Sequence, residues 1–136
     1  MTEAKNLYQN RRSVYELGKN LPISEQEVLE IIDNAVKHSP SAFNSQTAHA
    51  VVLLGENHQK LWDITFEELE KFLPNEEAKA ATKGKIDSFA AAYGTILFFE
   101  DHDVVKGLQE QFSSYADNFP IWSEQSTGIA SFAVWN

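Results

Sequence analysis

The sequence predicts an α+β protein, because two short β-rich runs lie between stretches with helical periodicity. The clearest helical signal is a capping box, in which Ser24 is followed by Glu27. Apolar residues then recur at helical spacing on one face, at Val28, Ile31, Ile32, Ala35 and Val36. The β-rich runs are Ala48–Leu54 and Thr95–Phe99. We therefore expect a small sheet with helices packed around it.

The elements before the first strand follow from local signals. Residues 3–9 predict a short helix, and residues 10–22 predict an irregular segment. The capped helix is expected to end near His38, because Pro40 disfavours helical geometry in the residue before it. The polar loop Ser39 to Gln46 follows.

The central part of the chain predicts two helices between the two strands. The first strand is apolar on both sides, so we expect it to be buried on both sides. Residues 73–75, Leu-Pro-Asn, separate the two helical stretches. Their apolar positions are Leu61, Ile64, Leu69 and Phe72 in one, and Ile86, Phe89, Ala90 and Tyr93 in the other.

The C-terminal part predicts two further helices. The acidic corner at residues 100–103 is suited to capping a helix, with apolar positions Val104, Val105, Leu108, Phe112 and Tyr115. Pro120 is expected to close the following loop. A stripe starting at Ile129 then reaches the end of the chain with no terminating signal. Two strands are also few for such a sheet, so we expect the chain to be truncated at its C-terminal end.

Composition restricts the function classes. The length of 136 residues predicts a single domain that spans residues 1–136. The formal charge of −9 argues against a nucleic-acid partner, and no apolar run approaches the roughly 20 residues of a membrane span. Zero cysteines exclude disulfides and thiol catalysis. Together with the lack of a secretory signal, they favour a soluble, cytoplasmic protein.

Arg11 and Arg12, the only arginines of the chain, are adjacent and are followed by Ser13. Two guanidinium groups and a hydroxyl suit the oxygens of a phosphate monoester. The alternative is a surface pair bound to Glu16 or Glu3.

The loop from Ser39 to Gln46 carries hydroxyls and two side-chain amides. An amide both donates and accepts, so Ser41, Asn44 and Gln46 could match the edge of a heterocycle. The alternative is an ordinary turn rich in Ser and Asn. Other catalytic motifs are missing. A metal at His102, between two aspartates, is less favoured than a solvated helix start.

Four stretches together resemble the nitroreductase family: residues 10–15 (NRRSVY), 39–46 (SPSAFNSQ), 94–101 (GTILFFED) and 115–125 (YADNFPIWSEQ). The last two are similar to the smaller branch that contains bacterial copper-induced and fungal stress-response nitroreductases. One departure is Tyr15, where many larger members carry a second basic residue. Family members also continue for roughly another third of a chain.

The resemblance implies an α/β/α sandwich with a central, mostly antiparallel sheet, and a homodimer with FMN at the subunit interface. Arg11, Arg12 and Ser13 would hold the FMN phosphate. Ser41, Asn44 and Gln46 would lie along the flavin, in part from the partner subunit. The implied chemistry moves two electrons from NAD(P)H through FMN to a nitroaromatic or a quinone. The alternatives are a non-enzymatic flavin-binding or regulatory protein, and an inactive truncated remnant.

Overall fold

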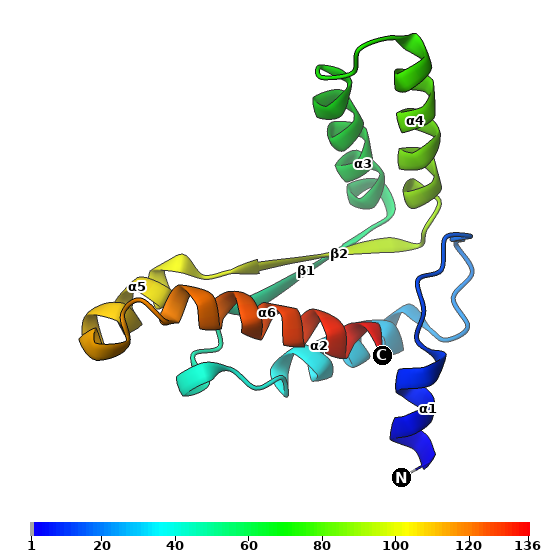
Figure 1. The fold of residues 1–136 in the computed structure, drawn as a ribbon. Coiled ribbons are helices and arrows are strands. Elements are labelled where there is room, and N and C mark those ends of the chain that lie inside the picture. The colour runs from blue at the N-terminus through cyan, green and yellow to red at the C-terminus, as the bar shows by residue number, and fades with distance from the viewer. Residues whose placement is uncertain (1) are drawn as a thin grey trace. The chain divides into compact units, whose positions relative to one another are not determined.

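The computed structural model describes residues 2–136, and its contacts divide the chain into two compact units (Figure 1). The first unit holds the chain up to Arg12, Ile23–Val51 and Leu97–Asn136. The second unit holds Ser13–Pro22 and Val52–Ile96. The assignment of the chain to a single domain remains a prediction.

Within these residues the chain forms six α-helices, two short 3₁₀ helices and two strands, which confirms the α+β class. In chain order they are α1 (Thr2–Asn10), α2 (Glu25–Lys37), η1 (Ala42–Asn44), β1 (Ala48–Leu54), α3 (Gly55–Glu70), α4 (Glu76–Ala90), β2 (Gly94–Glu100), α5 (His102–Gln111), η2 (Ser113–Tyr115) and α6 (Phe119–Trp135). The strands form a two-stranded antiparallel sheet (Figure 1). No helix among residues 2–136 has the length and apolar character needed to cross a membrane.

Helix α2 begins at the predicted capping box. The backbone N–H of Glu27 donates to the Ser24 hydroxyl oxygen at 3.2 Å, and the backbone N–H of Ser24 donates to the Glu27 carboxylate at 2.9 Å. The Ser24 hydroxyl also donates to that carboxylate, and these bonds hold the pKa of Glu27 below its ordinary value. Two N–H groups that a helix start leaves without partners are therefore satisfied.

We expect Ser24→Ala to lower the free energy of unfolding by about 1 kcal/mol at neutral pH, because the cap is lost. A carboxyl group whose pKa is lowered by folding stabilises the folded state at pH values above its unfolded-state pKa. This stabilisation is lost as the pH falls through its folded-state pKa. The difference between the variant and the wild type should therefore shrink in acid. Urea unfolding at several pH values measures it, with Ser88→Ala as an exposed control. A difference that grows in acid would contradict the prediction.

The strands lie where the sequence predicts them, but the expected burial of β1 on both sides is wrong. Its residues alternate between exposed and half-buried over the first four positions, and none is fully buried. A two-stranded sheet leaves one edge of each strand unpaired, so it encloses side chains less than a wide sheet does. Gly94 allows the strands to approach closely, since a Cβ there would lie 2.8 Å from the Leu53 carbonyl oxygen.

Two predictions for the C-terminal part are wrong. Helix α5 ends at Gln111, so Phe112 and Tyr115 lie outside it, and Phe112 has non-helical backbone angles (φ −122°, ψ 63°). Pro120 does not close a loop but lies in the first turn of α6. A residue there needs no backbone N–H, because the N–H groups of the first turn have no acceptor within the helix. Asp101 does cap α5, accepting from the backbone N–H groups of Asp103 and Val104.

The buried side of α6 also differs from the stripe that the sequence suggests. Ile129 and Phe132 are exposed, at 46% and 40%. The buried residues are Phe119, Ser123, Ser126 and Ala130. Three of these are small, which lets a neighbouring helix approach closely. Figure 1 shows α2 alongside α6 in the first unit, and contacts between these two helices confirm the packing.

The second unit is built on an antiparallel hairpin of α3 and α4, which pack side by side (Figure 1). His58 of α3 is only 3% exposed. Its Nδ1 lies 2.9 Å from the Thr95 hydroxyl and its Nε2 lies 3.0 Å from the Ala90 carbonyl oxygen. The indole N–H of Trp62 also donates to the Thr95 hydroxyl, at 3.1 Å. A buried polar side chain thus ties α3 to the end of α4 and the start of β2.

Candidate functional site

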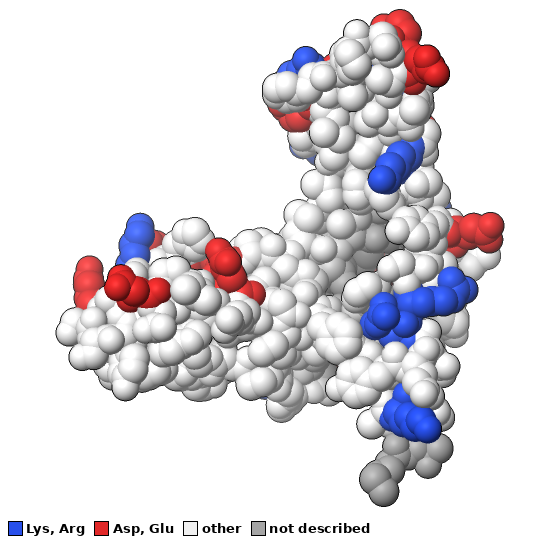
Figure 2. All heavy atoms as spheres, viewed as in Figure 1, with Lys and Arg blue, Asp and Glu red and all other residues white. Residues whose placement is uncertain are grey.

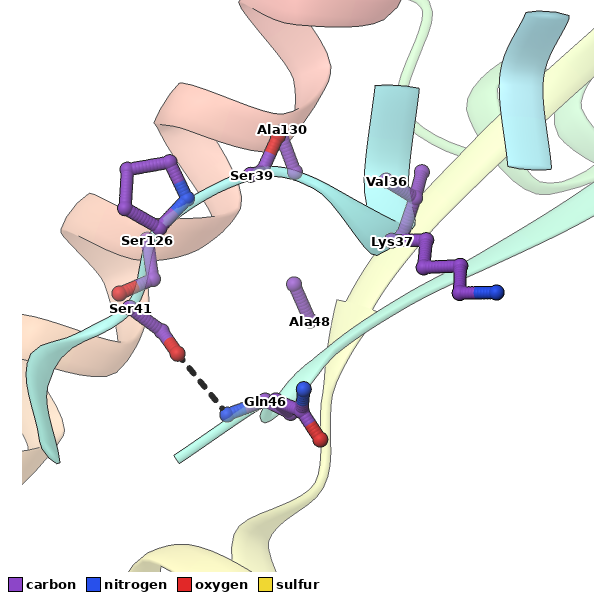
Figure 3. Close-up of a pocket in the computed structure, with 9 residues that line it drawn as sticks. Val36, Lys37, Ser39, Ser41, Gln46, Ala48, Ser126 and Ala130 are labelled. Carbon is purple, nitrogen blue, oxygen red and sulfur yellow. Dashed lines mark hydrogen bonds between the residues drawn. The ribbon is translucent and has the colours of Figure 1, made fainter. Parts of the chain in front are cut away.

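The loop between α2 and β1 has an unusual backbone. Phe43, Asn44 and Gln46 all adopt positive φ, at 57°, 52° and 51°. L-residues seldom occupy this left-handed region, although Asn tolerates it better than Phe. The Gln46 backbone N–H donates to the Ser41 hydroxyl at 3.0 Å and closes the loop on itself (Figure 3).

A pocket of about 200 Å³ lies beside this loop. Figure 3 shows its lining side chains, which come from α2, the loop, β1 and α6: Val36, Lys37, Ser39, Pro40, Ser41, Gln46, Ala48, Ser126 and Ala130. Ser41 and Gln46 are among the residues that the sequence analysis singled out. The contribution of α6 was missed, and the four-residue spacing of two small residues, Ser126 and Ala130, is the signal that would have indicated it.

A chain of buried hydroxyls lies directly after the loop. Thr47 is 1% exposed and Ser123 is 2% exposed, and their oxygens lie 2.8 Å apart. The Ser123 hydroxyl donates to the Glu100 carboxylate, so the bond between the two hydroxyls is donated by Thr47. The Asp101 backbone N–H donates to the Thr47 carbonyl oxygen at 2.9 Å. These bonds fix the C-terminal end of the loop.

Phe43, inside the loop, is a residue that the sequence analysis did not single out. Its ring contacts four other aromatic rings, with centroid separations of 5.0 to 5.8 Å. The partners are Phe112, Tyr115, Phe119 and Trp122. An aromatic residue within an otherwise polar loop is the signal that would have marked it.

The arginine pair lies at the end of α1. The Arg11 guanidinium carbon is 4.3 Å from the ring centroid of Trp135, a cation–π contact. Within the described part of the first unit, neither Arg11 nor Arg12 pairs with an acid, Glu3 included. Figure 2 shows basic side chains over α1, and mostly acidic ones with one basic side chain over α5. The donors of both guanidinium groups are therefore available to an anion.

One chain does not bring all six predicted residues into one pocket. Arg11 lines an open hollow of about 600 Å³ with residues of α1 and the end of α6, and Ser41 and Gln46 line the other pocket. Asn44 is exposed and lines neither. Arg12 is exposed at the start of the irregular segment, and Ser13 belongs to the second unit.

The residues present suit the two ends of a flavin mononucleotide. Two arginines without acidic partners in their unit fit a phosphate. The side chains of Asn44 and Gln46 are exposed, and neither forms a hydrogen bond with any other described residue, which leaves donors and acceptors for a heterocycle edge. By contrast, nowhere in residues 2–136 do three His, Cys, Asp or Glu side chains gather to hold a metal ion.

Comparison with known proteins identifies the family. The model of the nitroreductase family matches residues 8–136, which is nearly the whole chain. The chain belongs to the nitroreductase family. Among relatives of this nitroreductase chain, the Saccharomyces cerevisiae nitroreductases HBN1 and FRM2 are 34% and 32% identical over 127 and 132 residues. These matches cover 92% and 96% of the chain, which spans only 62% and 65% of the length of the two relatives.

Solved structures of nitroreductases also resemble this chain. The nitroreductase CinD from Lactococcus lactis, in complex with chloramphenicol, is 52% identical and superposes with a TM-score of 0.81. The match covers 97% of this chain and 65% of CinD. CinD has also been solved with nicotinic acid and with 4-nitrophenol. The nitroreductase fold expected from the four sequence motifs is thus confirmed, while a link to copper remains a prediction.

Proposed function

We propose that this nitroreductase-family protein is an FMN-dependent oxidoreductase that reduces nitroaromatics or quinones with NAD(P)H. The observation that carries the proposal is the arginine pair, which has no acidic partner in its unit although the chain carries a net charge of −9. Arg11, Arg12 and Ser13 would bind the phosphate, and Ser41, Asn44 and Gln46 would lie along the ring system.

When bound, FMN supplies the two-electron chemistry that no side chain of the protein can perform. In the overall reaction, a hydride from NAD(P)H and one proton reduce a nitro group to a nitroso group and water. A quinone takes up the same hydride and proton to become a hydroquinone. The protein's own residues would bind and orient the reactants. Chloramphenicol and 4-nitrophenol, which CinD binds, both carry a nitro group on an aromatic ring, which supports this substrate class.

We also propose that the protein acts as a homodimer in the cytoplasm. The separation of the arginine hollow from the loop pocket within one chain supports the dimer, because the loop of a second copy would then complete the site beside the arginines of the first. The pocket beside the loop, at about 200 Å³, is also smaller than cofactor sites of roughly 300 to 1,000 Å³.

The visible absorption spectrum of the purified protein, with and without added FMN, followed by gel filtration, tests the proposal. We expect flavin bands near about 370 and 450 nm to elute with a dimer, and NAD(P)H to be oxidised when 4-nitrophenol is added. Retained FMN without NAD(P)H oxidation by any acceptor would favour a non-enzymatic flavin-binding protein. Colourless protein that does not retain FMN would overturn the proposal and favour an inactive remnant.

A further inference from the structure

We propose that Phe43 is a positioning residue for the candidate flavin site, because its ring holds the loop in the conformation that presents Asn44 and Gln46. This inference rests on the proposed function and deepens it. Phe43 itself would not touch the reacting atoms. Its ring points into a cluster of aromatic side chains, and its backbone is the first of the three loop residues with positive φ.

The left-handed backbone is costly, so contacts outside the loop add to its own hydrogen bond between Gln46 and Ser41 in holding it. Phe43 has φ 57° and ψ 18°, and Asn44 and Gln46 share the left-handed region. Each such residue raises the free energy of the loop, so the conformation persists only where surrounding contacts determine it. Because L-residues favour negative φ, we expect the loop to leave this conformation when the contacts are removed, which would change the direction of the two amide side chains.

The aromatic cluster provides that contact. The centroid of the Phe43 ring lies 5.0 Å from that of Phe112 and 5.2 Å from that of Phe119. Phe119 is only 3% exposed. The rings that receive it also contact one another, as in the edge-on pair of Phe119 and Trp122 at 5.4 Å. Aromatic pairs at such separations contribute a favourable interaction energy in addition to the stabilisation from burying their surface. The aromatic residues that contact Phe43 therefore belong to α6 and to the segment after α5.

The loop is thus held at two points on either side of the amides. Phe43 is fixed by its ring, and Thr47 is fixed by its buried hydroxyl bond to Ser123. Asn44 and Gln46 lie between these two points, and their side chains are exposed. A loop that is already ordered loses less entropy when a ligand binds, so removing the Phe43 ring should weaken binding without removing any ligand contact.

The test compares Phe43→Ala with Phe99→Ala in the purified protein. Phe99 is a matched control, because it is 48% exposed against 49% for Phe43 and stacks on His49 instead of the loop. We expect Phe43→Ala to weaken the Kd for FMN by about three- to tenfold, and Phe99→Ala to leave it unchanged. Phe43→Tyr keeps the ring and should restore binding.

A second measurement needs no flavin. Without FMN, Phe43→Ala should speed hydrogen exchange in residues 41–47, including the Gln46 N–H that is bonded to Ser41. Exchange at the wild-type rate in this segment, or an unchanged Kd for FMN, would overturn the inference. If Phe43→Ala unfolds, Phe43→Leu replaces it, with the same expectation of faster exchange and the same contradicting result.

The two measurements separate failure of the inference from failure of the proposed function. If the wild-type protein does not bind FMN, the proposed function fails, while the exchange measurement still decides whether Phe43 holds the loop. If the wild type binds FMN and Phe43→Ala binds it equally well, the proposed function stands and the positioning role is wrong.

Discussion

Replacing Arg11 by alanine is expected to weaken FMN binding by about 10- to 100-fold, because a hydrogen bond to a charged group contributes about 1.5 to 3 kcal/mol. The guanidinium fork matches two phosphate oxygens at once, which a single ammonium group does not. Arg11 is only half-exposed, so water screens its charge less than it screens a fully exposed side chain.

The contact with Trp135 strengthens this expectation. The indole ring lies 4.3 Å from the Arg11 guanidinium carbon and restricts the positions of the side chain. A pre-positioned guanidinium loses less conformational entropy when it binds a phosphate. Arg11→Lys keeps the charge but loses the fork, so its affinity for FMN should lie between those of Arg11→Ala and the wild type.

Equilibrium titration with FMN, followed by flavin fluorescence, measures both Arg11 variants. Lys19→Ala is the control, because it removes a positive charge from an exposed position at which we propose no contact with FMN. Thermal unfolding of each variant shows whether the loss of the Trp135 contact disturbs the fold. Equal FMN retention in Arg11→Ala and Lys19→Ala would show that Arg11 does not bind the phosphate.

Replacing His58 by leucine should lower the free energy of unfolding by about 2 to 4 kcal/mol, because a buried side chain loses its hydrogen bonds to the buried Ala90 carbonyl oxygen and to the half-buried Thr95 hydroxyl. The Ala90 carbonyl oxygen only accepts, so Nε2 of His58 carries the proton. In the neutral ring, Nδ1 then accepts from the Thr95 hydroxyl, whose oxygen also accepts from Trp62. Leucine has similar bulk but makes neither bond.

Urea unfolding followed by circular dichroism measures the effect of His58→Leu. The control is His102→Leu, an exposed histidine at the start of α5, which should change the free energy of unfolding by less than about 0.5 kcal/mol. Because both variants exchange the same two residue types, the comparison isolates burial and hydrogen bonding. Similar unfolding midpoints for the two variants would mean that the buried histidine does not stabilise the α3–α4 hairpin.

Features governed by neighbouring residues were predictable from the sequence. The capping box of α2 depends on groups three residues apart, so Ser24 and Glu27 suffice to predict it. Pro40 likewise sets the end of α2, and the β-rich run gives the exact bounds of β1. The motifs at Arg11 and in the loop were sufficient to indicate the family, which the comparisons confirm.

Features governed by distant residues were not predictable. Phe112 and Tyr115 follow the helical spacing of α5, yet they lie outside the helix, and their rings pack against Phe43. The apolar positions Ile129 and Phe132 suggest one buried face for α6, whereas the face that contacts α2 is lined with small residues. Helical spacing is the same for both faces, and only the partner decides which one is buried.

The sequence alone therefore determined the element types, the family and the residues proposed to bind FMN, because these follow from local spacing and short motifs. Only the tertiary structure decided how the loop is held, with Phe43 among aromatic rings and Thr47 hydrogen-bonded to Ser123, 76 residues away. It also decided that Arg11 lies against Trp135 and pairs with no acid of its unit. Such contacts depend on which distant elements pack together, and the spacing of residues along the sequence does not specify this packing.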